Sequence, residues 1–188
     1  MLIDLTMKIT PQMAADAQAL GKKELEGHLG THFDVMHEEF PLEYTQRGGI
    51  VFDVSAVRDR DIEASDIDIG RVQKNAFVAF YTGYAEKEAY GSRAYFKEHP
   101  QLSPSMICAL VEKGVSIIGV DCAGIRRGTE HIPTDRYCAE HGVFVVENLC
   151  NLKALLHCGK GFTVNTYPMN YTEITGLPCR VIAEMDVQ

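Results

Sequence analysis

The stretch from residue 76 to residue 146 constrains the fold most, because apolar runs typical of buried strands alternate there with helical patterns. The runs lie at 76–82, 115–120 and 143–146. Successive strands that are joined through helices pair in parallel by right-handed crossovers. This stretch therefore predicts three neighbouring parallel strands in the centre of an α/β domain.

The helix between the first two runs has recognisable ends. Ser103 suits the N-cap, Pro104 suits the first helical position, and Gly114 suits the end of the helix. Apolar residues at three- to four-residue spacing give this helix one face that can be buried. A shorter helix is predicted at 134–140, before the third run.

The segments on either side are rich in strand patterns and contain no long helical pattern. They predict strands at 2–7, 49–54, 162–167 and 180–185, an irregular or partly helical loop at 9–23, and a loop at 40–49. Together, the patterns favour a single compact α/β domain over residues 1–188. We expect it to have a central mixed β-sheet and flanking helices.

Charge and composition exclude several classes of partner. The chain has 188 residues, 26 acidic and 18 basic side chains, and a formal net charge of −8. Nucleic acids and anionic membranes bind clustered Lys and Arg, so this acidic balance argues against both. No apolar run approaches the roughly 18 residues of a membrane span, and no secretory signal pattern is visible. We therefore expect a cytoplasmic protein.

The cysteines are expected to be mostly reduced thiols. All six lie in the C-terminal half, and none forms a C-x-x-C pair. A zinc site built from such scattered cysteines is a weak alternative.

Two histidines and an aspartate within seven residues form the candidate site: His28, His32 and Asp34. Zn²⁺ and Mn²⁺ accept both imidazole and carboxylate ligands. In an extended chain residues 28 and 32 would lie roughly 13 Å apart, too far to share one ion. In a helix residue 34 would point away from them. A shared ion needs a bend between the two histidines and extended chain after it, and Gly30 tolerates the backbone angles of such a bend. The spacing alone leaves a metal site and ordinary surface or core histidines as alternatives.

The segment His28-x-Gly30-Thr31-His32-x-Asp34 resembles the H-x-G-T-H-x-D signature of the cyclase-like metal-dependent hydrolases, a family that includes bacterial kynurenine formamidase. Four further landmarks of that family follow in the same order: FVAFYTG at 77–83, HPxLS at 99–103, GVD at 119–121 and VENL at 146–149. The resemblance therefore covers most of the chain.

This resemblance implies a compact α/β fold and assembly as a homodimer or homotetramer. It also implies a divalent metal, Zn or Mn, held by His28, His32 and Asp34. A second ion or a supporting shell would use Glu147 together with two further histidines of the family pattern.

The sequence departs from the family pattern at both of those histidines. The motif usually continues D-x-P-x-H, but here Met36 replaces the proline, Glu38 stands at the histidine position, and His37 lies one place earlier. The histidine expected twelve residues before Glu147 is Asp135. Either the second site persists with oxygen-rich ligands that favour Mn²⁺ or Mg²⁺ over Zn²⁺, or it is lost. His131, in the loop that leads to Asp135, is a possible substitute.

The function that the resemblance implies is hydrolysis of an amide or related acyl bond, of the arylformamidase or cyclic amide type, by a metal-activated water. His37 or Glu38 is the predicted catalytic base, and Glu147 and Asp135 are predicted to bind a second ion or to orient the ligands. The aromatic residues Phe33, Phe40, Tyr44 and Tyr84 are expected to pack in the core, so no residue is assigned to the small-molecule substrate. One alternative is a non-catalytic metal-binding module on the same scaffold. A weaker one is a thiol hydrolase that uses Cys122 or Cys138.

Overall fold

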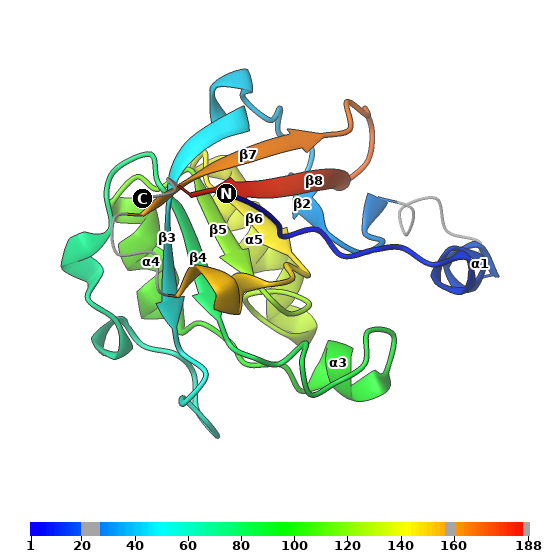
Figure 1. Ribbon diagram of the computed structural model, residues 1–188, viewed down its shortest axis with the longest axis horizontal. Coiled ribbons are helices and arrows are strands. Elements are labelled where there is room, and N and C mark those ends of the chain that lie inside the picture. The colour runs from blue at the N-terminus through cyan, green and yellow to red at the C-terminus, as the bar shows by residue number, and fades with distance from the viewer. Residues whose placement is uncertain (20–26, 157–160, 186–188) are drawn as a thin grey trace.

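Seven strands close into a barrel, and an eighth, β1, lies outside this ring on β8 (Figure 1). The computed structural model describes residues 1–19, 27–156 and 161–185. Around the barrel the order is β8-β2-β6-β5-β4-β3-β7, and β7 pairs again with β8. The strands are β1 (Leu2–Asp4), β2 (His32–Asp34), β3 (Gln46–Asp53), β4 (Phe77–Tyr81), β5 (Ile117–Val120), β6 (Phe144–Glu147), β7 (Phe162–Pro168) and β8 (Gly176–Glu184).

Strands β3 to β6 are parallel neighbours, and the remaining pairs are antiparallel. The predicted parallel arrangement of the runs within 76–146 is therefore confirmed. Closure depends on the length of β8. One edge of β8 pairs with β7, while the other edge pairs with β2 near its start and with β1 near its end.

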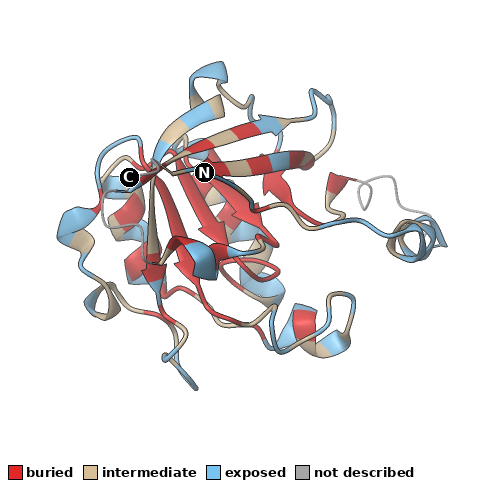
Figure 2. Cartoon of the chain, in the orientation of Figure 1, coloured by how far each residue is buried: buried red, intermediate tan, exposed pale blue. Residues whose placement is uncertain are grey.

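The helices of the described residues are α1 (Pro11–Ala19), α3 (Arg93–Lys97), α4 (Pro104–Glu112) and α5 (His131–Glu140). The predicted start of α4 is confirmed, because the Ser103 hydroxyl accepts a hydrogen bond from the Met106 backbone N–H at 3.1 Å. Helix α1 has no buried residue and lies away from the barrel (Figures 1 and 2). Within the residues that the structure describes, no helix has the length and apolar character needed to cross a membrane.

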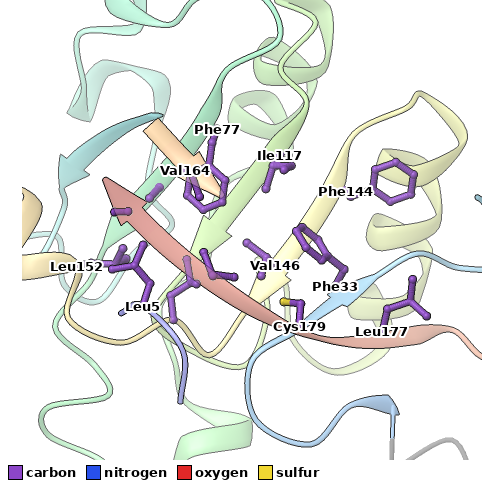
Figure 3. Close-up of a cluster of buried hydrophobic side chains, with 14 of the residues drawn as sticks. Leu5, Phe33, Phe77, Ile117, Phe144, Val146, Leu152, Val164, Leu177 and Cys179 are labelled. Atoms are coloured by element: carbon purple, nitrogen blue, oxygen red, sulfur yellow. The ribbon is translucent and has the colours of Figure 1, made fainter. Parts of the chain in front are cut away.

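Two apolar layers hold the barrel together. Side chains alternate along each strand, so Phe77 and Ala79 of β4 face the interior while Val78 and Phe80 face outward. The interior also contains Phe33, Val146 and Val164, which Figure 3 shows among the other buried apolar side chains of this cluster. On the outside, the second layer packs against Met106 and Leu110 of α4.

Several predicted boundaries were wrong, and pairing with distant strands explains two of them; the strand predicted at 2–7 ends at Asp4. The expected loop at 40–49 contains a short 3₁₀ turn, and β3 begins at Gln46 because residues 46–49 pair with β7. Strand β8 begins at Gly176 instead of residue 180, because its first residues pair with β2. Helix α5 begins at His131 instead of residue 134.

Other local predictions are confirmed. Phe33 packs against Phe40, and the partly buried Phe40 and Tyr44 pack against Phe144 of the core, as expected for these aromatic side chains. Cys158 lies outside the described residues. The other five cysteines are free thiols: Cys108, Cys122, Cys138, Cys150 and Cys179.

Candidate metal centre

The centre of the site is the pairing of β2 with β6. In this antiparallel register His32 lies directly opposite Glu147. Phe33 and Val146 fill the barrel interior, so the alternating residues His32, Asp34 and Glu147 lie on the outer face. All three are almost completely buried.

A bend before β2 brings His28 back to this face. Gly30 has φ of +70°, a backbone conformation that glycine adopts readily and L side chains rarely adopt, so the bend favours glycine. The His28 Nε2 atom lies 3.2 Å from Asp34 Oδ1, and the rings of His28 and His32 are 4.9 Å apart. The bend that a shared ion requires is therefore present at the predicted position.

Helix α5 covers the other side of the cluster. His131 and Asp135 stand one helical turn apart and share a face. His131 Nε2 lies 3.4 Å from Asp135 Oδ2 and 3.6 Å from Glu147 Oε1. The early start of α5 thus makes His131 part of the cluster.

Two overlapping groups of ligand atoms result. His28, His32 and Asp34 form one group, and Asp34, His131, Asp135 and Glu147 form the other. Within each group all of the ligand atoms lie within 4.8 Å of one another, and Asp34 belongs to both. This is the spacing of atoms that surround a small cation.

Backbone carbonyls orient two of the histidine rings in the same way. His32 Nδ1 lies 2.8 Å from the Gly30 carbonyl oxygen, and His131 Nδ1 lies 3.1 Å from that of Arg126. A carbonyl oxygen only accepts, so each Nδ1 carries the hydrogen and donates it. When such a ring is neutral, its Nε2 atom presents a lone pair to the carboxylate cluster, as in a metal-ligating histidine.

The buried acceptors of the cluster lack donors. Among the described residues, seven buried side-chain atoms have no hydrogen-bond partner, and six of them belong to this cluster. The six are His32 Nε2, both oxygens of Asp34, both oxygens of Asp135, and Glu147 Oε1. Buried polar atoms normally have partners, and six converging acceptors without a donor fit a bound cation.

Electrostatics favour the same conclusion. Burial raises the pKa of Asp135 and Glu147 well above the ordinary carboxyl range, and the Asp34 charge raises both further. Burial also opposes ionisation of Asp34, but His32 and His28 outweigh it and hold the pKa of Asp34 below its ordinary value. Three buried carboxyl groups this close together repel one another when they are ionised, so a bound cation would favour their charged forms.

The cluster opens into a hollow of about 480 Å³. His28, His32, His131 and Glu147 line it together with side chains that the sequence did not single out: Met13, Tyr90, Phe96, Lys97, Arg127 and Ile132. These additional residues come from α1, from α3 and the loop before it, and from the start of α5 and the turn before it. No local pattern marks them, because only tertiary packing brings these segments together.

His37 and Glu38 lie elsewhere. Both are exposed in the turn after β2 and line a different hollow, formed with the connection between β7 and β8. Neither belongs to the groups of converging ligand atoms. The structure therefore brings together five predicted metal ligands and His131, but not the two predicted bases.

Comparison with known proteins identifies the family of the chain. The family model described as "Putative cyclase" matches residues 3–126, which include His28, His32 and Asp34. The chain belongs to this family. The resemblance seen in the signature segment is therefore confirmed. No curated protein sequence matches the chain significantly.

Solved structures share the fold of this cyclase-family chain. One, described as a potential metal-dependent hydrolase with cyclase activity, has 23% identity and a TM-score of 0.76, with 100% of this chain and 99% of that chain covered. Isatin hydrolase A from Labrenzia aggregata, bound to benzyl benzoate, has 20% identity, a TM-score of 0.74, and coverage of 98% and 93%. Isatin hydrolase A from Ralstonia solanacearum has 19% identity, a TM-score of 0.75, and coverage of 99% and 92%.

Proposed function

We propose that the chain is a metal-dependent hydrolase of amide or related acyl bonds, with aromatic cyclic amides such as isatin as the first substrates to test. The observation that carries the proposal is the set of six buried acceptor atoms without donors. Isatin hydrolases among the structural relatives support the choice of substrate class. The narrower arylformamidase activity, hydrolysis of N-formyl aryl amides, is part of the same proposal.

The donor set fits divalent ions. His28, His32 and Asp34 would hold one ion with two imidazoles and a carboxylate, a set that suits Zn²⁺ or Mn²⁺. Asp34, Asp135, Glu147 and His131 would hold a second ion with more oxygen, which favours Mn²⁺. In this proposal His131 supplies the imidazole that the family pattern places at position 135.

Each part of the site has a separate task. A divalent ion would supply Lewis-acid chemistry, lowering the pKa of water and polarising the scissile carbonyl. The carbonyls of Gly30 and Arg126 hold two imidazole rings so that their lone pairs face the cluster. Burial keeps bulk water away from the carboxylates, which strengthens their interaction with positive charge.

Other predictions from the sequence stay predictions. A general base at His37 or Glu38 is one of them, and the proposed function does not depend on it, because both residues lie outside the cluster. A cytoplasmic location and a homodimer or homotetramer also stay predictions. A non-catalytic metal-binding module is the second candidate function, and the departures at positions 38 and 135 favour it.

The test is turnover by protein of known metal content. Protein stripped by chelator and reloaded with Zn²⁺ or Mn²⁺ would be analysed for bound metal and assayed with isatin and N-formyl aryl amides. We expect turnover that disappears with chelator and returns with metal. His32→Ala should lose both the metal and the activity. Metal binding without turnover of any amide would favour the non-catalytic module, and inactivation by iodoacetamide but not by chelator would favour a thiol hydrolase.

A further inference from the structure

Tyr90 presents an unused hydrogen-bond donor beside the cluster. It lines the same hollow as His32 and Glu147. The Gly30 backbone N–H donates to the Tyr90 hydroxyl oxygen at 3.0 Å. Because the amide is the donor, the phenol keeps its own proton for another acceptor. Within the described residues the Tyr90 hydroxyl has no other hydrogen-bond partner.

The hydroxyl is held in place from two directions. The Tyr90 ring packs edge-to-face against Tyr95 and Phe96, with ring centroids 5.3 and 5.6 Å away. Gly30, whose N–H contacts the hydroxyl, accepts hydrogen bonds at its carbonyl from His32 Nδ1 and Asn148 Nδ2. The same glycine therefore sets the position of both the phenol and the His32 ring.

The phenol stays protonated in this environment. Burial raises the pKa of Tyr90, the hydrogen bond from Gly30 opposes that rise, and the Glu147 charge adds to it. At neutral pH Tyr90 is therefore a neutral donor and not a base.

We propose that Tyr90 is a catalytic residue of the hydrolase proposed above, and that its O–H donates a hydrogen bond to the oxygen of the scissile carbonyl. In the step that it assists, the oxygen of water forms a bond to the carbonyl carbon. The π electrons of the C=O bond move to the oxygen, and a proton of the water passes to a general base. When the C–N bond breaks, the C=O bond re-forms and the general base returns its proton to the leaving nitrogen. Tyr90 keeps its proton throughout and contributes only the hydrogen bond.

A donor aimed at a developing oxyanion typically contributes about 10²–10³-fold to kcat. The neutral phenol has the right charge for this task, since it adds no negative charge to a cluster already rich in carboxylates. Tyr90 also stands apart from the predicted ligands, so its removal need not remove the metal.

The test is Tyr90→Phe, with Tyr84→Phe as the matched control. The Phe ring retains the packing against Tyr95 and Phe96, so the variant should fold. The Tyr84 hydroxyl donates to the Ala94 carbonyl at 2.9 Å, and Tyr84 does not line the hollow. We expect Tyr90→Phe to lower kcat for isatin by about 10²-fold or more, with KM and the metal dissociation constant within about threefold of wild type. Tyr84→Phe should leave kcat unchanged.

Three results would overturn this role. Unchanged kcat in Tyr90→Phe, with an active wild type, removes Tyr90 from the mechanism but leaves the proposed function intact. A weaker metal affinity that accounts for the lost activity makes Tyr90 a positioning residue that acts through Gly30 and His32. Absence of turnover by the metal-loaded wild type rejects the proposed function, and the role of Tyr90 with it.

Discussion

Asp121 and Glu147 are buried carboxylates at the ends of adjacent parallel strands, and within the described residues they differ in the hydrogen bonds that they accept. Asp121 follows β5 and accepts hydrogen bonds from the Thr82 N–H, the Thr82 hydroxyl and the Gly83 N–H. Glu147 ends β6, and among the described residues its Oε1 has no hydrogen-bond partner. Its carboxylate oxygens lie 3.6 Å from the Nε2 atoms of His32 and His131.

The difference separates a structural acid from a candidate metal ligand. Burial raises the pKa of both carboxyls, but hydrogen bonds lower the pKa of Asp121, while Asp34 and Asp135 raise that of Glu147 further. Hydrogen bonds within the fold thus offset part of the cost of burying the charge of Asp121, whose pKa stays above the ordinary value. A bound cation would play the corresponding part for Glu147.

The strongest test of this division of roles makes the same acid-to-amide change at Asp121 and at Glu147. Glu147→Gln should weaken metal binding by more than the roughly 10–100-fold typical of groups that only support ligands, without destabilising the metal-free protein. Asp121→Asn should lower the free energy of unfolding by about 2 kcal/mol, because it places an amide against three donors.

Titration calorimetry and thermal melting of the metal-free proteins would measure both effects. Equal losses of metal affinity in the two variants would contradict the division of roles.

A second prediction concerns pH. The pKa of Asp135 and Glu147 is raised in the folded protein, so the fold binds their protons more tightly than the unfolded chain does. Their contribution to stability is full below the unfolded pKa of about 4 and declines as pH rises through the folded pKa. Between about pH 5 and about pH 7.5, metal-free wild type should therefore lose more stability than Glu147→Gln, and bound metal should remove the difference.

Melting curves of both proteins with and without Mn²⁺ would test this. Burial lowers the pKa of His99 to about 4, which has the opposite effect on stability, but His99 is common to both proteins and cancels in the comparison. A difference that persisted with saturating metal would contradict the explanation.

The smallest effect is expected outside the cluster. A general base contributes about 10²–10⁴-fold, but His37 and Glu38 line another hollow, so we expect His37→Ala and Glu38→Gln to keep kcat within about threefold of wild type. A loss of a hundredfold or more, with unchanged metal content, would instead support the base predicted from sequence.

Local sequence was sufficient wherever the cause was local. The Ser103 cap, the alternation of apolar runs with helices, and the glycine bend between His28 and His32 all follow from short-range backbone preferences. The family signature also allowed the predicted ligands around Asp34 to be named from sequence. These features required no knowledge of which distant segments meet.

Tertiary structure decided the closure of the barrel and the complete lining of the site. Both depend on which distant segments pack together. Closure of the barrel requires β8 to pair with strands on both of its edges. His131 joins the cluster because α5 packs against β6. The Tyr90 hydroxyl reaches Gly30 across 60 residues of sequence. The sequence by itself determined the chemical types of the ligands and the bend that gathers them, and packing decided which side chains complete the site.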